Sequence, residues 1–383
     1  MDEKQLDAFI GIRHQIHQHP ELEGDTIQTA QLVADHLNAY GYQMHRNIGG
    51  HGVVGVLKKG QGDKRLGIRA DMDALPILEK NHFSYVSKVA GKMHACGHDG
   101  HTTLLLAAAK QIADQVDFNG TLNLIFQPAE ETLKGAKQMI EQGLFEKFPC
   151  DAVYGLHNMP GIAVGTVEVQ TGTMMAGLNK VVCKIIGLGG HGGIPELTHD
   201  PVLAVGAFID AVNSIKSRNL AVQDYAVISI GSIHTGTAFN IIPNEAVIQL
   251  SIRTDSKAVM QKITQRLKQI TQGIALSFNV KFELIIDDLV PPLVNSPHET
   301  EILIQALQRH QKEIVVRGLS EKKMTSEDFA LMSDIVPGCY FFLGNGEGSF
   351  GGCSIHNAEY DFNDENILIG SNCWKALVET YLV

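Results

Sequence analysis

The 383-residue chain lacks long hydrophobic runs and a signal-like N-terminus. Its longest apolar stretches, at 104–109 and 202–209, are well short of the roughly 18 residues that indicate a membrane-spanning helix. The N-terminal segment MDEKQLDAF is charged and acidic, whereas a secretory signal is basic and then apolar. We therefore expect no membrane partner and a cytoplasmic location.

Paired cysteines and an excess of positive charge are also missing. The six cysteines are not spaced in pairs, and a chain of this size in a reducing compartment does not depend on disulfides. Lys and Arg total 31 against 42 Asp and Glu, a net charge of -11 that repels phosphate backbones. Nucleic acid is therefore not expected as a main partner.

Hydrophobic residues make up 44% of the chain, enough for a core in each of two domains. Short apolar runs punctuated by glycine alternate with segments of helical period, which predicts an α/β fold with a mostly parallel mixed sheet between helices. The strands expected at 52–57 and 65–70 are joined by Gly-Gln-Gly-Asp, which resembles a hairpin connection. Further strands are expected at 121–126, 151–156 and 339–343, and helices at 3–18, 26–38, 102–115, 133–142, 298–311 and 365–380.

The middle of the chain has a different order of elements. Between 179 and 286 the pattern predicts βαββαβ, the order of a ferredoxin-like split-βαβ sandwich. Asp200 is expected to cap the first helix of this segment. We therefore expect an inserted domain at 177–287, between two parts of a catalytic domain at 1–176 and 288–383.

Metal-ligand residue types are densest in the segment His94-Ala95-Cys96-Gly97-His98-Asp99-Gly100-His101. Side chains two residues apart face alike on loop or extended backbone, so Cys96 and His98 could share an ion there. Gly97 and Gly100 make such a loop plausible. The alternative is a helix entry with incidental histidines and a small buried thiol.

Two adjacent acids, Glu130 and Glu131, follow the strand expected at 121–126. Neighbouring side chains diverge, so one could bind a metal while the other takes a proton from water. The alternative is two solvated acids at a helix N-terminus, where the helix dipole favours them.

Two further histidines, His157 and His356, also lie near expected strand ends, although each alone could be an ordinary loop histidine. With Cys96, His98 and Glu131 they supply five ligands of zinc-like type. Five ligands suggest two ions.

Several segments closely resemble one family, the aminoacylase/carboxypeptidase type of metallo-amidohydrolases, in the branch with hippurate hydrolase, N-acetyldiaminopimelate deacetylase and auxin-conjugate hydrolases. The resemblance extends from Arg13 and the His17–Leu22 segment to the last helix. It is carried by RADMDALP (69–76), KMHACGHDGHTTLLL (92–106), QPAEE (127–131), GLHNMPGIAVGTV (155–167), TAFNIIPNEA (237–246), TSEDFA (325–330) and IHNAEYDFND (355–364).

The resemblance implies a zinc-exopeptidase-like catalytic domain with two divalent ions and a lid that forms a homodimer. Cys96 would bridge the ions, Glu130 would be the general base, and the remaining ligands would be His98, Glu131, His157 and His356. Thiolate and imidazole suit zinc, and manganese, cobalt or nickel can occupy such a site.

The resemblance also assigns roles outside the ligand set. His191 would reach the oxyanion from the partner subunit, although without the resemblance it reads as a turn histidine. Asn240 and Arg253 would bind the substrate carboxylate, although Arg253 could equally be a solvated strand-end charge. Asp71 is expected to orient a histidine ligand, and Asp73 and His101 have a weaker claim to the same role.

We therefore expect a metal-dependent hydrolase that cleaves N-acyl amino acids into a carboxylic acid and a free amino acid. A metallo-dipeptidase or carboxypeptidase would use the same centre and remains an alternative. A nonenzymatic metal or small-carboxylate binding protein would share the two-domain shape, but Glu130 argues against it. A nicotinamide dehydrogenase is remote because no Gly-x-Gly-x-x-Gly follows a strand into a helix.

Overall fold

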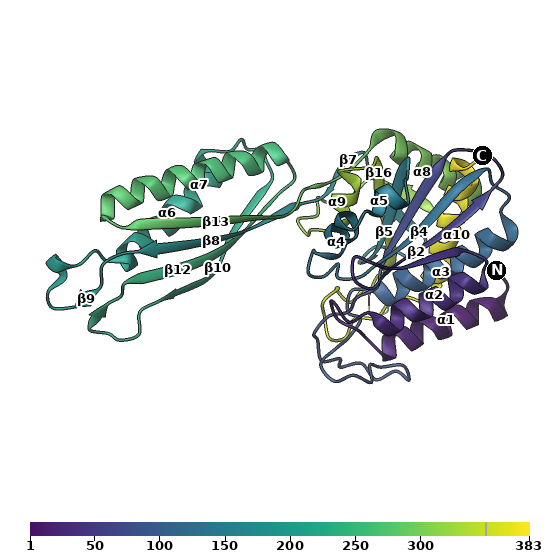
Figure 1. Ribbon diagram of the computed structural model, residues 1–383, viewed down its shortest axis with the longest axis horizontal. Coiled ribbons are helices and arrows are strands. Elements are labelled where there is room, and N and C mark those ends of the chain that lie inside the picture. Colours follow the sequence, from purple (N-terminus) through teal and green to yellow (C-terminus); the bar gives the residue numbers. More distant parts are fainter. Residues whose placement is uncertain (349–350) are drawn as a thin grey trace. The chain divides into compact units, whose positions relative to one another are not determined.

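The computed structural model describes residues 1–348 and 351–383, which form two compact units (Figure 1). The first unit contains residues 1–174, 294–322 and 328–383. The second unit contains residues 175–293 and 323–327. The chain passes between them at β7 (Gly172–Met175) and β14 (Leu293–Asn295), which pair with each other, and again at the two ends of the 323–327 segment.

An eight-stranded mixed sheet forms the centre of the first unit, in the order β1-β2-β4-β3-β5-β16-β6-β15. The four central strands from β4 to β16 are parallel, whereas β1, β2 and β6 pair antiparallel with β2, β4 and β16. This arrangement confirms the expected fold class. The strands are β1 (Gln43–Ile48), β2 (Gly52–Lys59), β3 (Arg65–Asp71), β4 (Gly120–Gln127), β5 (Ala152–Pro160), β6 (Thr166–Glu168), β15 (Val315–Arg317) and β16 (Gly338–Gly346).

The hairpin expected between β2 and β3 is wrong, because β4 lies between these strands. Leu124 of β4 is opposite Gly55 of β2 on one side and opposite Ile68 of β3 on the other. A strand such as β4, with seven of its eight residues buried, needs a neighbour on both sides to pair its backbone groups. The Gly60–Asp63 connection is instead held by Asn119, whose Oδ1 accepts the N–H groups of Gln61 and Gly62.

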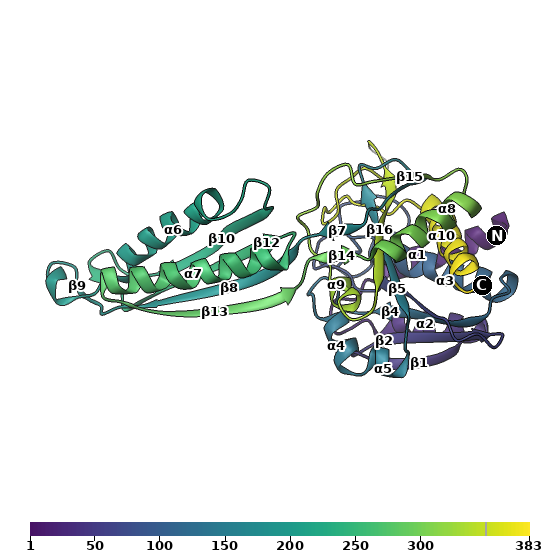
Figure 2. The same ribbon diagram turned by 90° about the horizontal axis from the view of Figure 1, so that it is seen from above.

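Helices cover both faces of this sheet (Figures 1 and 2). α3 is buried along most of its length because it packs between the sheet and the helices α1 and α10. One face carries α1 (Glu3–Gln18), α2 (Ile27–Ala39), α3 (His98–Gln115), α8 (Pro297–His310) and α10 (Glu365–Tyr381), and the other carries α4 (Gly135–Glu141), α5 (Leu144–Lys147) and α9 (Phe329–Ser333).

The second unit is a four-stranded antiparallel sheet with two helices on one face (Figure 2), and it confirms the expected βαββαβ order. Asp200 caps α6 as expected, since its carboxylate accepts the N–H of Val202 at 2.8 Å. The main elements are β8 (Gly177–Ile186), α6 (Pro201–Arg218), β10 (Ala226–Thr235), β12 (Glu245–Thr254), α7 (Lys257–Phe278) and β13 (Lys281–Val290), with the short β9 (Gly190–His191), η1 (Pro195–Leu197) and β11 (Ile241–Ile242) at one end.

None of the helices formed by residues 1–348 and 351–383 combines the length and apolar character of a membrane span. All six cysteines are free thiols.

Candidate metal centre

The candidate centre lies where the central parallel strands of the first unit end. β3 ends at Asp71, β4 ends three residues before Glu130, and β5 carries His157 in its second half. The loop before α3 brings Cys96 to the same place, with its Sγ atom 3.2 Å from Nε2 of His157. Carboxyl ends of neighbouring strands are the usual ligand-binding edge of an open α/β sheet.

All five expected ligands come together there in two overlapping triads. Sγ of Cys96 lies within 4.8 Å of ligand atoms of His98 and His157, which form the first triad. The second triad joins Cys96 to Glu131 and His356, again within 4.8 Å. Because Cys96 belongs to both triads, its sulfur would be within reach of either ion if two were bound.

Two buried polar atoms of these triads support cation binding. Nε2 of His98 and Oε1 of Glu131 have no hydrogen-bond partner among the described residues, and they lie 3.9 Å apart. Leaving such groups unpaired costs free energy. A cation contacted by both would remove this cost, and the thiolate, imidazole and carboxylate set suits divalent zinc-like ions. The residues present therefore fit a two-ion centre.

Neighbouring carbonyl groups fix the tautomers of two candidate ligands. Nδ1 of His98 donates to the Asp73 carbonyl at 2.8 Å, and Nδ1 of His157 donates to the Asn158 carbonyl at 2.5 Å. Each ring therefore directs Nε2 to the centre, which is the second-sphere arrangement of metal-binding histidines. Burial, together with the nearby His101 and His98, holds the pKa of His157 well below its ordinary value.

The electrostatic field of the site favours a cation. Burial alone would lower the pKa of His98, but the charges of Asp71, Asp73 and Glu131 raise it to about 10. Burial and the carboxylates of Glu131 and Glu130 raise the pKa of the Cys96 thiol well above its ordinary value. A divalent cation would reverse that effect, since metal binding deprotonates a coordinating thiol.

Asp73 fixes the backbone of the adjacent acids Glu130 and Glu131. The two carboxylate oxygens of Asp73 accept the N–H groups of Glu130 and Glu131, each at 3.0 Å. Glu131 directs its carboxylate between the histidines, with Oε2 3.4 Å from Nε2 of His356. Glu130 is only 7% exposed and lies in the same cluster as His98 and Glu131. It is therefore an acid beside the proposed ligand set.

Asp71 contacts histidines, as expected for an orienting residue. Its Oδ1 accepts from Nδ1 of His101 at 2.7 Å, and its Oδ2 accepts from Arg69 at 2.7 Å. Burial opposes ionisation, but the charges of His98, Arg69 and His101 hold the pKa of Asp71 well below its ordinary value. His101 also accepts the N–H of Asn158 through Nε2. Both ring nitrogens of His101 are therefore occupied, which argues against it as a metal ligand.

The three other candidate residues, His191, Asn240 and Arg253, belong to the second unit. His191 and Asn240 lie close together, because His191 pairs with Ile241 and the Asn240 carbonyl accepts the N–H of Gly192 at 2.9 Å. Arg253 lies near the opposite end of β12, where its Nη1 donates to the Met324 carbonyl and the Ser326 hydroxyl. The second unit therefore gathers two of these residues and separates the third.

Sequence reasoning missed Asn158 and Tyr360. The Asn158 side chain donates to the Cys96 carbonyl at 3.0 Å and also contacts the Tyr360 hydroxyl. Both residues are close in sequence to a proposed ligand, Asn158 directly after His157 and Tyr360 four residues after His356. That closeness was the available signal, but residue type alone did not point to a metal site.

The comparison with known families decides the class of this protein. Residues 67–380 match the model of peptidase family M20/M25/M40. The chain belongs to this family. The match confirms the resemblance found from the sequence motifs and the amidohydrolase class that it implied.

Characterised relatives span nearly the whole chain. The chain is 42% identical over 374 residues to hippurate hydrolase of Campylobacter jejuni, covering 98% of this chain and 96% of the relative. It is 36% identical over 343 residues to N-acetyl-L-cysteine deacetylase of Bacillus subtilis, covering 89% and 80%. The crystal structure of the Bacillus subtilis YXEP protein, a dinuclear metal binding peptidase from the M20 family, has a TM-score of 0.87 at 27% identity and covers 100% of this chain and 99% of its own. These relatives support metal-dependent amide hydrolysis.

Proposed function

We propose that the protein hydrolyses N-acyl amino acids at the centre formed by Cys96, His98, Glu131, His157 and His356. One observation carries this proposal: two ligand triads share the Cys96 sulfur, and Glu130 lies beside them outside both triads. The substrate class follows the relatives, which are named for hippurate and for N-acetyl-L-cysteine. Zinc suits the ligand set best, and manganese, cobalt or nickel are the other candidates.

The chemistry divides between the ions and the acid. Divalent ions in such a site polarise a carbonyl group and lower the pKa of water. Glu130 accepts the proton of the attacking water and passes it to the nitrogen of the leaving amine, so the acyl group leaves as a carboxylic acid and the amino acid is released. Asp73 keeps Glu130 in place for both transfers through the Glu130 N–H.

We assign 1–176 and 288–383 to catalysis and 177–287 to a lid that forms a homodimer. In support, Leu197, Leu203 and Ile241 are 70%, 62% and 54% exposed and Phe239 is fully exposed. They lie on or next to η1, α6 and β11, at one end of the second unit. An exposed apolar cluster of this kind typically marks a protein–protein interface.

The lid residues serve two different chains in this proposal. At about 3.3 Å per residue, β12 carries Arg253 about 26 Å from Glu245, which pairs with the last residue of β8. His191 and Asn240 lie beyond that end. A small substrate cannot contact Arg253 and His191 of the same chain, so one of them comes from the partner subunit. Arg253 suits bidentate binding of the substrate carboxylate, and His191 suits an oxyanion.

A substrate panel with defined metals tests the function. Metal-free protein is loaded with zinc, manganese, cobalt or nickel and assayed with N-benzoyl and N-acetyl amino acids, with dipeptides and with N-acyl amino acid amides. We expect turnover of the acyl amino acids and much weaker turnover of the amides, which lack the carboxylate. Preferential cleavage of dipeptides would favour the metallo-dipeptidase alternative, and no hydrolysis with any metal would contradict the proposal.

A further inference from the structure

The side-chain amide of Asn158 connects segments that carry proposed ligands. Its Nδ2 donates one hydrogen to the Cys96 carbonyl at 3.0 Å and contacts the Tyr360 hydroxyl at 2.8 Å. The backbone of Asn158 contributes as well, since its carbonyl accepts from Nδ1 of His157 and its N–H donates to His101. Asn158 is fully buried. One residue therefore touches the Cys96 loop, the His157 ring and the His101 ring.

Tyr360 connects this amide to the loop that carries His356. Its hydroxyl donates to Oδ1 of Asn158 at 2.6 Å, and the side chain is fully buried. Tyr360 is four residues beyond His356 in an irregular segment, where His356 has a positive φ of 63° and donates its N–H to the Ala95 carbonyl. The side chain of His356 is 52% exposed. Packing therefore restrains this ligand less than the other histidines, and its position depends more on how its loop is fastened.

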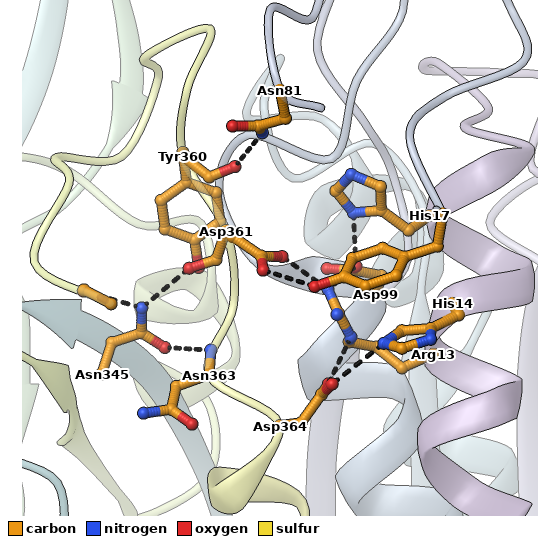
Figure 3. Close-up of polar contacts among 12 residues, drawn as sticks. Arg13, His14, His17, Asn81, Asp99, Asn345, Tyr360, Asp361, Asn363 and Asp364 are labelled. Atoms are coloured by element: carbon orange, nitrogen blue, oxygen red, sulfur yellow. Dashed lines mark hydrogen bonds and ion pairs between the residues drawn. The ribbon is translucent and has the colours of Figure 1, made fainter. Parts of the chain in front are cut away.

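A second set of contacts fixes the residue next to Tyr360 (Figure 3). Asp361 pairs with Nη1 of Arg13 at 2.9 Å, and the same nitrogen lies 3.3 Å from Asp99, the residue after His98. Tyr85 donates its hydroxyl to Asp361 at 2.6 Å. Since these ion pairs hold the backbone of the loop, loss of the Tyr360 hydroxyl alone is expected to loosen the loop without unfolding it.

We infer that Asn158 and Tyr360 are positioning residues. They set the position of the Cys96–Glu131–His356 triad relative to the Cys96–His98–His157 triad. This inference rests on the proposed two-ion centre. The Tyr360 hydroxyl restrains the loop of the second triad directly. It reaches the Cys96 loop through the Asn158 amide, whose bond to the Cys96 carbonyl remains without it. The Asn158 amide restrains both triads. The two residues therefore differ in which ion they support.

Metal binding tests this assignment without reliance on activity. Stepwise affinities for Co²⁺ are measured by competition with a chelator, and the cobalt–thiolate absorption band reports on Cys96. Tyr360→Phe should weaken one of the two bound ions about tenfold or more and leave the other unchanged, as loss of a second-sphere partner does. The ion that Tyr360→Phe retains should have the same affinity and the same absorption band as the single ion retained by His356→Ala. Asn158→Ala should weaken both ions.

Tyr42→Phe is the matched control. Tyr42 is also buried in the first unit, and its hydroxyl donates to the Ala109 carbonyl at 3.1 Å, eleven residues from His98. Both ions should bind this variant normally. If Tyr360→Phe binds both ions as Tyr42→Phe does, or weakens both equally with a lower melting temperature of the metal-free protein, the inference is wrong. If the unaltered protein binds no Co²⁺, the two-ion centre itself is wrong, and the inference falls with it.

Discussion

The carboxylate of Asp73 accepts the backbone N–H of Glu130 at 3.0 Å, and its other oxygen accepts the N–H of Glu131 at the same distance. Two consecutive N–H groups thus converge on one buried acid. The residue before them, Ala129, has a positive φ of 57°, a left-handed conformation that alanine rarely adopts. Asp73 therefore stabilises a strained turn that points one glutamate at the ligand atoms and places the other beside them.

Asp73→Asn should lower kcat about 10- to 100-fold with a smaller change in KM, because one of the two N–H groups would face the amide NH₂ instead of an acceptor. Steady-state kinetics of the zinc-loaded protein measure this effect. Asp63→Asn, at an exposed site of the same unit, should behave as the unaltered protein. Equal kinetics of the two variants would show that Asp73 does not position the acids.

Glu130 and Glu131 should respond differently to substitution although they are adjacent. Glu130→Gln should keep both ions and lose at least about 100-fold in turnover, because an amide cannot accept the proton. Glu131→Ala should instead reduce the metal content, since it removes a ligand of the second triad. Elemental analysis together with turnover separates the two cases. A Glu130→Gln protein with normal turnover would contradict the proposed base.

Gly97→Ala should damage the centre more than another glycine substitution with similar backbone strain. A Cβ atom at Gly97 would lie 2.4 Å from Oδ1 of Asn158 and 2.5 Å from the Tyr360 hydroxyl. The φ of Gly97 is +94°. Gly91 has a φ of +77° but nothing within 4 Å of a Cβ atom. Both variants should lose thermal stability, and only Gly97→Ala should also lose metal affinity. Equal metal affinity of the two variants would count against the packing seen at Gly97.

His17 should make the stability of the first unit depend on pH above neutrality. Its ring is buried between Asp99 and Glu79, at 2.8 and 3.1 Å. Burial lowers its pKa, but the hydrogen bonds to these two carboxylates outweigh burial and raise the pKa from 6.5 to about 9. Because the folded pKa is raised, the contribution of His17 is fully present below pH 6.5 and is lost as the pH rises through about 9.

His17→Gln should therefore flatten the decline of the unfolding free energy between pH 6.5 and 9, by up to about 3 kcal/mol. Denaturant unfolding of the metal-free protein at several pH values provides the measurement. His298→Gln, at an exposed position, should leave the decline unchanged. The same pH slope in His17→Gln and in the unaltered protein would mean that His17 is not held protonated.

The five candidate ligands could be selected from the sequence because they are distinctive residue types in recognisable positions, and the structure brings their side chains together. Cys96 and His98 flank a glycine just before an apolar helix, and Glu131 follows a run of buried β residues. Periodicity was also sufficient for α1, whose observed bounds are those expected, and for the βαββαβ order of the second unit.

Other features depend on partners that periodicity does not encode. β2 and β3 looked like a hairpin because they are close in sequence, but the burial of β4 on both sides places it between them. Asn158 and Tyr360 are 202 residues apart, and their hydrogen bond exists only because β5 and the segment after β16 are packed together. The strain at Ala129 likewise arises from a bond to Asp73, which belongs to a different segment.

The separation of His191 from Arg253 along the second unit leads to a test with mixed subunits. If one of the two serves the site of the partner, a dimer of one His191→Ala chain and one Arg253→Ala chain has one site with both residues intact and one site with neither. Random pairing of equal amounts of the two chains should then restore about one quarter of the normal activity, whereas each variant alone is nearly inactive. The experiment uses co-expressed chains with different affinity tags, so that the mixed dimer can be isolated and assayed.

As a control, chains carrying Glu130→Gln and Glu131→Ala should not complement each other, since both acids belong to the first unit of one chain and each site of the mixed dimer keeps one defect. An inactive mixed dimer of the His191→Ala and Arg253→Ala chains would mean that both residues act within one chain, contrary to the strand geometry. A residue with no part in the reaction would be recognised earlier, because its single variant would keep normal activity.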